Sequence, residues 1–204
     1  MRLKQRLARL ATTVVVRSPA AWWVFRGALR RAFDRLAPSW DGLGSDSQRL
    51  AALEAALARL ELEPRRALDL GTGTGSAARL VAARWPLAEV VGVDLSAGMI
   101  EQARWHPAAG RERYEVADAA QLPFDGRVFD LVTLNNMIPF FDELARVTAP
   151  GGSVVIAFSH GAKTPIWVPL ERVEAELQRR GFEHVANFAA GNGVSLLAHR
   201  VERA

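Results

Sequence analysis

The chain has 204 residues, of which 50% are apolar and 24% charged, and its formal net charge is +4. A chain of this length can bury one sizeable core, and this balance of residues is typical of a soluble globular protein. The sequence has no cysteine, which excludes disulfides, thiolate metal sites and cysteine nucleophiles.

The positive charge is concentrated at the N-terminus. Residues 1–35 carry nine arginines and lysines against one acidic residue, Asp34, so this arm has a net charge of +8 and the rest of the chain −4. Its uncharged stretches, "LATTVVV" and "SPAAWWVF", are far shorter than the roughly 20 residues of a membrane span. No good cleavage site follows the first apolar run, so we expect no signal peptide and a cytoplasmic protein.

After the arm, residues 37–47 are typical of a loop, and leucines at 50, 53, 57 and 60 predict an amphipathic helix. Strands and helices alternate from there. The predicted strands are 66–70, 88–96, 113–118, 129–135 and 151–159, and the predicted helices are 76–84, 97–105 and 139–147. A last helix within 168–182 precedes two strands, 184–189 and 193–200, joined by a short turn.

Alternation of this kind predicts an α/β protein with a Rossmann-like, doubly wound sheet of seven strands. The sheet is expected to be mostly parallel, with an antiparallel hairpin at the C-terminus and a helical arm at the N-terminus. The predicted division is a basic helical arm or lid over residues 1–45 and a ligand-binding domain over residues 46–204.

Three glycines at alternate positions follow the first predicted strand, in "ALDLGTGTGSAARL" (residues 67–80). Ligands of such sheets bind at the carboxyl ends of the strands, and glycine lets backbone amides approach a ligand closely. The amides and the start of the next helix favour a negatively charged group. A tight strand-to-helix connection without a ligand is the alternative interpretation.

Asp94 ends the second predicted strand, about twenty residues beyond the glycines, where a carboxylate can accept both hydroxyls of a ribose. The alternative role for Asp94 is to cap the following helix. With the glycines, Asp94 indicates a cofactor that contains a nucleoside, and a dinucleotide remains open on these residues alone.

Residues at the ends of two further strands narrow the choice among cofactors that contain a nucleoside. Asp118 ends the third predicted strand, where a carboxylate can accept from the exocyclic amine of adenine, and the amide of Ala119 can serve the adjacent ring nitrogen. Asn135 and Asn136 follow the fourth strand. In its "DLGTGTG", "GVDLS", "DAAQLPF", "FDLV" and "RVTAPGG" segments the chain resembles the class I S-adenosylmethionine-dependent methyltransferases, particularly those that act on small molecules. The resemblance covers roughly residues 33–200.

The resemblance implies a cofactor, S-adenosyl-L-methionine, its product S-adenosyl-L-homocysteine, and a set of binding residues. Asp69 and the amides of the glycine turn would hold the methionine end, Asp94 the ribose, and Asp118 the adenine. The complete implied set is Asp69, Gly71, Thr72, Gly73, Gly75, Asp94, Leu95, Met99, Asp118, Ala119 and Asn135.

The expected function is in-line methyl transfer to a small-molecule acceptor. A non-catalytic or partner-dependent methyltransferase-like protein is the alternative from another class. A nicotinamide-dinucleotide dehydrogenase is disfavoured because Ser76 stands where the GxGxxG pattern requires its last glycine. The acceptor, the methylated atom and the oligomeric state stay open.

The acceptor side carries few signals. The catalytic residues are unknown; His160, after the fifth strand, is the best-placed histidine, and a solvated loop histidine is its other interpretation. No histidine and carboxylate residues stand at metal-ligand spacing, so we expect no metal. Because the connections after strands four and five are short, the cover of the acceptor is expected from the arm, with five candidate aromatic residues: Trp22, Trp23, Phe25, Trp40 and Trp167.

The arm itself allows two interpretations. Residues 20–36 are expected to pack across the cofactor cleft, while residues 1–17 are equally compatible with docking on the core and with peripheral contact with a membrane surface, which would suit a lipid-like acceptor. Nucleic acid is not expected as a partner, because the body of the chain is net acidic and no base-reading module is present.

Overall fold

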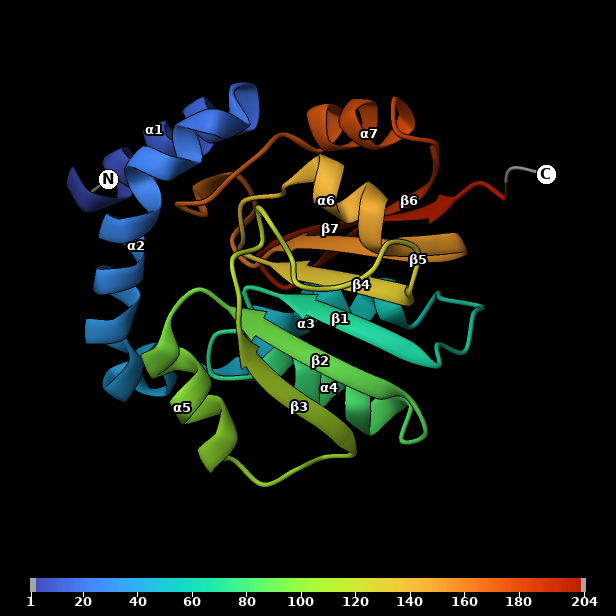
Figure 1. Ribbon diagram of the computed structural model, residues 1–204, viewed down its shortest axis with the longest axis horizontal. Coiled ribbons are helices and arrows are strands. Elements are labelled where there is room, and N and C mark those ends of the chain that lie inside the picture. Colours follow the sequence, from blue (N-terminus) through green and yellow to red (C-terminus); the bar gives the residue numbers. More distant parts are fainter. Residues whose placement is uncertain (1–2, 203–204) are drawn as a thin grey trace.

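A single seven-stranded sheet forms the centre of the computed structural model, which describes residues 3–202 (Figure 1). The strand order is β3-β2-β1-β4-β5-β7-β6. The strands are β1 (Arg66–Leu70), β2 (Glu89–Asp94), β3 (Arg111–Val116), β4 (Phe129–Asn135), β5 (Thr148–Phe158), β6 (Phe182–Ala190) and β7 (Gly193–Arg200). Strands β1 to β5 pair in parallel, and β7 is antiparallel to both β5 and β6. The predicted Rossmann-like sheet with its C-terminal hairpin is confirmed.

Helices cover both faces of this sheet. They are α1 (Leu3–Arg17), α2 (Trp22–Leu36), α3 (Asp46–Leu57), α4 (Ser76–Arg84), α5 (Ala97–Trp105), α6 (Phe141–Val147) and α7 (Leu170–Gln178). Apolar residues of α3, α4 and α5 pack with Ala67 and Val90 on one face, and those of α6 and α7 pack with Leu68 and Val91 on the other. Because successive strand residues point to opposite faces, central strands buried on both faces are continuously apolar, as the sequence "VVGV" of β2 shows.

The observed boundaries differ from the predicted ones at the start of α3 and at the start of β5. Helix α3 begins at Asp46, within the segment expected to be a loop, and the rest of that segment contains two short 3-10 turns. The "APGG" turn expected before the fifth strand lies inside β5. Residues 149–152 bulge there, because Thr148 pairs with Phe129 and Ser153 already pairs with Leu131.

The N-terminal arm docks on the core in the part that the structure describes. The Arg9 side chain donates to the carbonyl oxygens of Ala162 and Thr164, and Arg172 of α7 donates to the carbonyl oxygen of Val16. Val15 is buried in the same apolar cluster as the strands. Residues 8–17 therefore dock on the core. Residues 1 and 2, which belong to the segment considered for membrane contact, lie outside the described residues.

Candidate functional site

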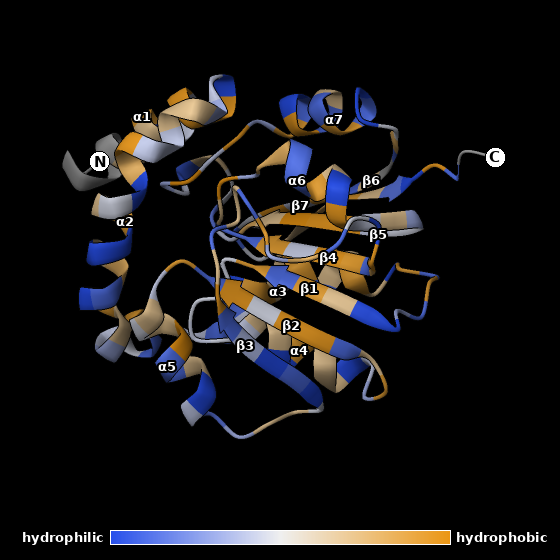
Figure 2. Cartoon of the chain, viewed as in Figure 1, coloured by the Kyte–Doolittle hydropathy of each residue, from blue (hydrophilic) through white to orange (hydrophobic). Residues whose placement is uncertain are grey.

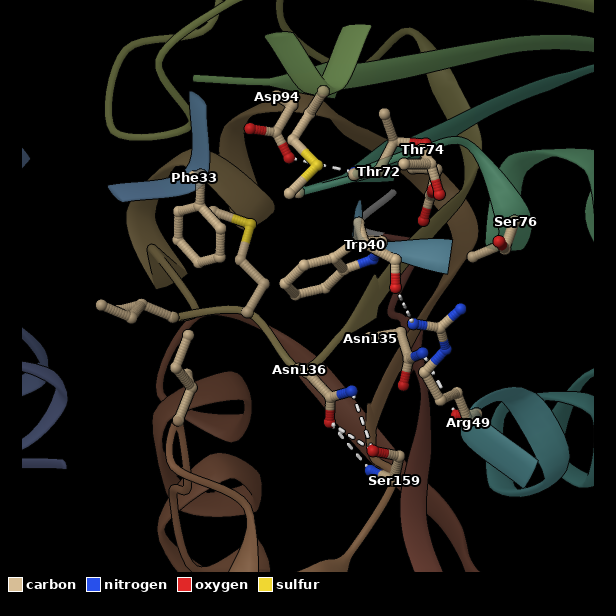
Figure 3. Close-up of a pocket in the computed structure, with 18 of the residues that line it drawn as sticks. Phe33, Trp40, Arg49, Thr72, Thr74, Ser76, Asp94, Asn135, Asn136 and Ser159 are labelled. Carbon is tan, nitrogen blue, oxygen red and sulfur yellow. Dashed lines mark hydrogen bonds between the residues drawn. The ribbon is translucent and has the colours of Figure 1, made fainter. Parts of the chain in front are cut away.

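A cavity of about 500 Å³ lies at the carboxyl ends of β1, β2 and β4, between these ends and the N-terminal segment (Figure 3). Gly71 and Gly73 form part of its wall. Its polar lining is Asp46, Arg49, Asp69, Thr72, Thr74, Ser76, Asp94, Asn135, Asn136, Ser159, His160 and Thr164. Its apolar lining is Ala8, Trp22, Leu29, Phe33, Trp40, Leu43, Leu50, Ala77, Val93, Leu95, Met99, Ala117, Ala119, Met137, Ile138, Pro165 and Ile166.

The glycine turn after β1 brings backbone directly to the cavity. Gly71 has φ of +67° and Gly73 has φ of +56°, in the left-handed region that favours glycine. A Cβ on Gly71 would lie 2.6 Å from the Met137 sulfur, so any larger residue would displace that side chain. The turn is held by the Thr72 amide, which donates to the Val93 carbonyl oxygen at 2.9 Å.

Asp69 is a buried carboxylate at the end of β1, with 1% of its surface exposed. The Thr133 hydroxyl donates to its Oδ1 at 2.8 Å, and its Oδ2 has no hydrogen-bond partner within residues 3–202. Burial raises the pKa of Asp69 to about 6, because removing water penalises the charged form. A cationic group of a ligand in the cavity would supply the missing partner.

Asp94 ends β2 and organises the turn opposite. Its Oδ2 accepts from the Gly73 amide at 3.0 Å and its Oδ1 from the Ser96 amide at 2.8 Å. Burial raises the pKa of Asp94 above its usual value. The N-terminus of α5 is capped by other oxygens: the Ser96 hydroxyl accepts from Met99 N, and Asp34 accepts from Gly98 N. The capping role considered for Asp94 is thus filled by Ser96 and Asp34.

Asp118 does not line the cavity itself, although its chain neighbours Ala117 and Ala119 do. Both of its oxygens accept from the indole nitrogen of Trp22, at 2.8 and 3.0 Å, and Oδ2 also accepts from Arg26 at 3.3 Å. Of the predicted cofactor-binding set, Gly75 and Asp118 do not line the cavity, and the other members do. No local pattern in the sequence indicates that Trp22, 96 positions upstream, would donate to Asp118.

Two asparagines stand at the end of β4: Asn135 is its last residue and Asn136 follows it. The Asn135 amide donates to the Arg49 carbonyl oxygen at 3.2 Å, while its buried Oδ1 has no partner in the described part of the chain. Asn136 adopts φ of +58°, and its Oδ1 accepts from the Ser159 amide at 2.9 Å. Left-handed backbone at a non-glycine residue is uncommon, and here it turns the chain sharply at the edge of the cavity.

The segment before β1 contributes residues that motif reasoning missed. Arg49 reaches the cavity from α3 (Figure 3). It forms an ion pair with Asp46, which also accepts from the Ser76 hydroxyl at 2.7 Å. Asp41 accepts from the Thr74 hydroxyl at 2.6 Å. The extent of the methyltransferase resemblance, which begins at about residue 33, was the one sequence signal that included this segment.

The acceptor-side predictions have mixed outcomes. His160 lines the cavity with an exposed side chain, and its amide donates to the Thr164 hydroxyl at 3.2 Å. Of the five expected aromatic residues, Trp22 and Trp40 line the cavity. The expectation is wrong for Trp23, which is 61% exposed, and for Trp167, which packs edge-on against Phe158. Phe25 packs against the apolar core and is not part of the lining.

Known proteins match the domain and the fold. A family model described as a methyltransferase domain matches residues 67–152. The malonyl-[acyl-carrier protein] O-methyltransferase of Halorhodospira halophila is 38% identical over 143 residues, 65% of this chain and 48% of that protein. The demethylmenaquinone methyltransferase of Thermus thermophilus is 41% identical over 140 residues, 61% of this chain and 62% of that protein.

Among solved structures, Haemonchus contortus phosphoethanolamine N-methyltransferase 2 in complex with S-adenosyl-L-methionine has a TM-score of 0.58 at 22% identity, covering 76% of this chain and 52% of that one. This similarity is one of fold. The chain spans about half to three-fifths of the length of the two curated relatives.

Proposed function

We propose that this chain, which belongs to the class I S-adenosylmethionine-dependent methyltransferase family, transfers a methyl group from S-adenosylmethionine to a small apolar acceptor. The observation that carries the proposal is one continuous cavity with unpaired buried acceptors at the glycine turn and a largely apolar remainder. The cofactor supplies a methyl group on a sulfonium, which is already activated toward a nucleophile.

The residues present fit the charges of this cofactor. We propose that Asp69 Oδ2 and Asn135 Oδ1, both without a partner in the described chain, accept from the methionine ammonium group. Asp94 takes the ribose hydroxyls, and Leu95, Met99 and Ala119 of the predicted set pack around the adenine. Thr72 and the backbone of Gly71 and Gly73 complete the cradle.

The cofactor carboxylate needs a cation. Arg49 is the one arginine or lysine among the described lining residues, and its side chain is 18% exposed. A guanidinium of this kind can pair with a carboxylate through two parallel hydrogen bonds. We therefore assign the methionine carboxylate to Arg49.

Asp118 can accept a hydrogen bond from adenine only if its present hydrogen-bond donors share it or move away. Its oxygens accept from Trp22 and Arg26 of α2, so an adenine amine would have to share or replace these donors. We propose that residues 1–45, as far as they are described, act as a lid on the domain formed by residues 46–204, and that the Trp22–Asp118 contact holds this lid closed.

The chain contributes to methyl transfer mainly by positioning and by excluding water. A new bond forms between the acceptor nucleophile and the methyl carbon while the carbon–sulfur bond breaks, and S-adenosylhomocysteine leaves. Holding the two reactants in line can supply an effective molarity of about 10⁵ M or more. A base is needed where the acceptor must lose a proton, as a hydroxyl or a ring C–H does, and His160 is the histidine that the described cavity offers for it.

The acceptor class is inferred from the lining. Leu29, Ile138, Pro165 and Ile166 give the cavity an apolar wall, which suits a hydrophobic acceptor better than a charged one. One relative is named for demethylmenaquinone and another for malonyl-[acyl-carrier protein], and the apolar wall favours an acceptor of the first kind for this chain.

Two measurements test the function. Isothermal titration calorimetry should show binding of S-adenosylhomocysteine, and incubation with labelled S-adenosylmethionine and a demethylmenaquinone analogue in its reduced, hydroquinone form should transfer label to the analogue. A chain that binds neither form of the cofactor would refute the proposal. Binding without transfer to any quinone or thioester acceptor would instead support the non-catalytic alternative.

Replacing Arg49 with glutamine should weaken S-adenosylhomocysteine about tenfold, since one charge-assisted pair to the carboxylate is lost. 5′-Methylthioadenosine, which lacks the amino-acid end, should bind the variant and the wild type equally well. Equal losses for both ligands in calorimetry would show that Arg49 acts on the cavity as a whole and not on the carboxylate.

A further inference from the structure

We infer that the outer surface of α2, with the corner before it, docks on anionic membrane lipid. We call this the α2 outer surface and define it as Pro19, Ala20, Trp23, Val24, Arg31 and Arg35, all of which are exposed. Trp23 is 61% exposed and Val24 is 77% exposed. Exposed large apolar side chains beside arginines are the composition of interfacial helices.

Helix α2 has one face toward the cavity and another toward solvent. Trp22, Leu29 and Phe33 line the cavity. At 3.6 residues per turn, Val24, Arg31 and Arg35 fall on the side opposite these residues, and Trp23 lies on the flank of the helix, about 100° from the cavity face. Figure 2 shows hydrophilic and hydrophobic residues interleaved along α2. Because Phe33 and its neighbours hold the helix in place, the outer side chains are left for a contact outside the chain.

The charge of this region fits an anionic surface. Arg17, Arg31 and Arg35 are exposed, and none of them has a hydrogen bond or ion pair within the described residues. The whole segment 1–35 contains Asp34 as its single acidic residue, and Asp34 bonds inward to Ser96. Basic residues near an anionic leaflet are attracted to its surface.

The shape of the surface favours lipid over a protein partner. A stable protein interface buries about 800 Å² on each partner, usually with a packed apolar centre. The α2 outer surface is one convex helix with two large apolar side chains, too few for such a centre. Tryptophan beside arginine, with Arg26 stacked 3.6 Å from the centre of the Trp23 ring, suits the headgroup boundary instead.

The contact is peripheral and extends the proposed function. None of the helices described over residues 3–202 is long and apolar enough to cross a bilayer. With α2 on the membrane, the cavity would lie about one helix diameter, roughly 10 Å, from the lipid. The link to an apolar acceptor rests on the proposed function, whereas the lipid contact itself does not.

Cosedimentation of the full chain with vesicles tests the inference. The probes are phosphatidylcholine vesicles with and without about 30% phosphatidylserine at low salt. We expect the chain to pellet with the anionic vesicles alone. Trp23→Ser/Val24→Ser and Arg31→Glu/Arg35→Glu should each lower the partition coefficient at least about tenfold.

Matched variants elsewhere on the surface serve as controls. Leu87→Ser/Trp105→Ser removes two apolar side chains that are 86% and 79% exposed, and Arg59→Glu/Arg65→Glu makes the same charge change on exposed arginines. Both controls should bind vesicles as the wild type does. Equal loss in the controls, or wild-type protein that stays in the supernatant, would overturn the inference. Calorimetry with S-adenosylhomocysteine on the same samples separates this outcome from failure of the proposed function.

Discussion

Replacement of Asp94 by alanine is expected to weaken S-adenosylhomocysteine binding about a hundredfold. Two charge-assisted hydrogen bonds to the ribose would be lost, and a net contribution of about 1.5 kcal/mol from each corresponds to roughly a hundredfold for the pair. The Gly73 amide, which donates to Asp94 at 3.0 Å, would lose its partner, so the turn itself would loosen. Calorimetry near pH 7 measures the change.

The control for this experiment is Asp125→Ala, which removes an exposed aspartate outside the cavity. It should leave the affinity unchanged. An Asp94→Ala protein with wild-type affinity and a wild-type unfolding transition would refute the ribose assignment, because the carboxylate would then have no role in ligand binding.

Asp69 is expected to make cofactor binding depend on pH. Burial raises its pKa to about 6 in the free protein, whereas an ammonium partner in the bound state favours the charged form. Binding then requires loss of a proton below pH 6, and the affinity for S-adenosylhomocysteine should fall about tenfold from pH 7 to pH 5. Asp69→Asn should bind about thirtyfold more weakly at pH 7 and lose most of this dependence.

Calorimetry at several pH values checks both statements. The pH dependence of folding has the opposite sign to that of binding. In the free protein, the contribution of Asp69 to the free energy of unfolding increases as pH falls from about 6 toward 3.8, the ordinary pKa of aspartate, because the folded state binds the proton more readily than the unfolded state. A wild-type affinity that is constant from pH 7 to pH 5 would refute the ion pair. Dependence that survives in Asp69→Asn would belong to Asp94, whose pKa is also raised.

The parallel strands of the sheet could be predicted from the sequence because the patterns that indicate them are local. Continuous apolar runs such as "VVGV" predict buried parallel strands, and the predicted helix 76–84 has the observed boundaries. The insertion of β7 between β5 and β6 was not predictable in this way. It depends on which edge the last strand pairs with, and no local pattern of "GVSLLAHR" encodes that pairing.

In the candidate site, too, the residues at strand ends were predictable from local patterns, and those brought in by long-range contacts were not. The predicted cavity residues Asp69, Asp94 and Asn135 end strands, and the carboxyl ends of parallel strands meet at one edge. Arg49 was missed because an arginine on a helix of unremarkable pattern is normally solvated. The partners of Asp118 were missed because their pairing with α2 joins segments far apart in the sequence.

Arg26 connects the two sides of α2. Its side chain stacks on Trp23 outside and reaches Asp118 inside, at 3.6 and 3.3 Å respectively. A ligand that takes Asp118 therefore changes the surroundings of Trp23, and a surface that inserts Trp23 changes the competition for Asp118. Thermodynamic reciprocity requires these two effects to be equal in free energy. The indole fluorescence of Trp23 is thus expected to report cofactor occupancy, and vesicles are expected to shift the cofactor dissociation constant by the same factor with which the cofactor shifts vesicle binding.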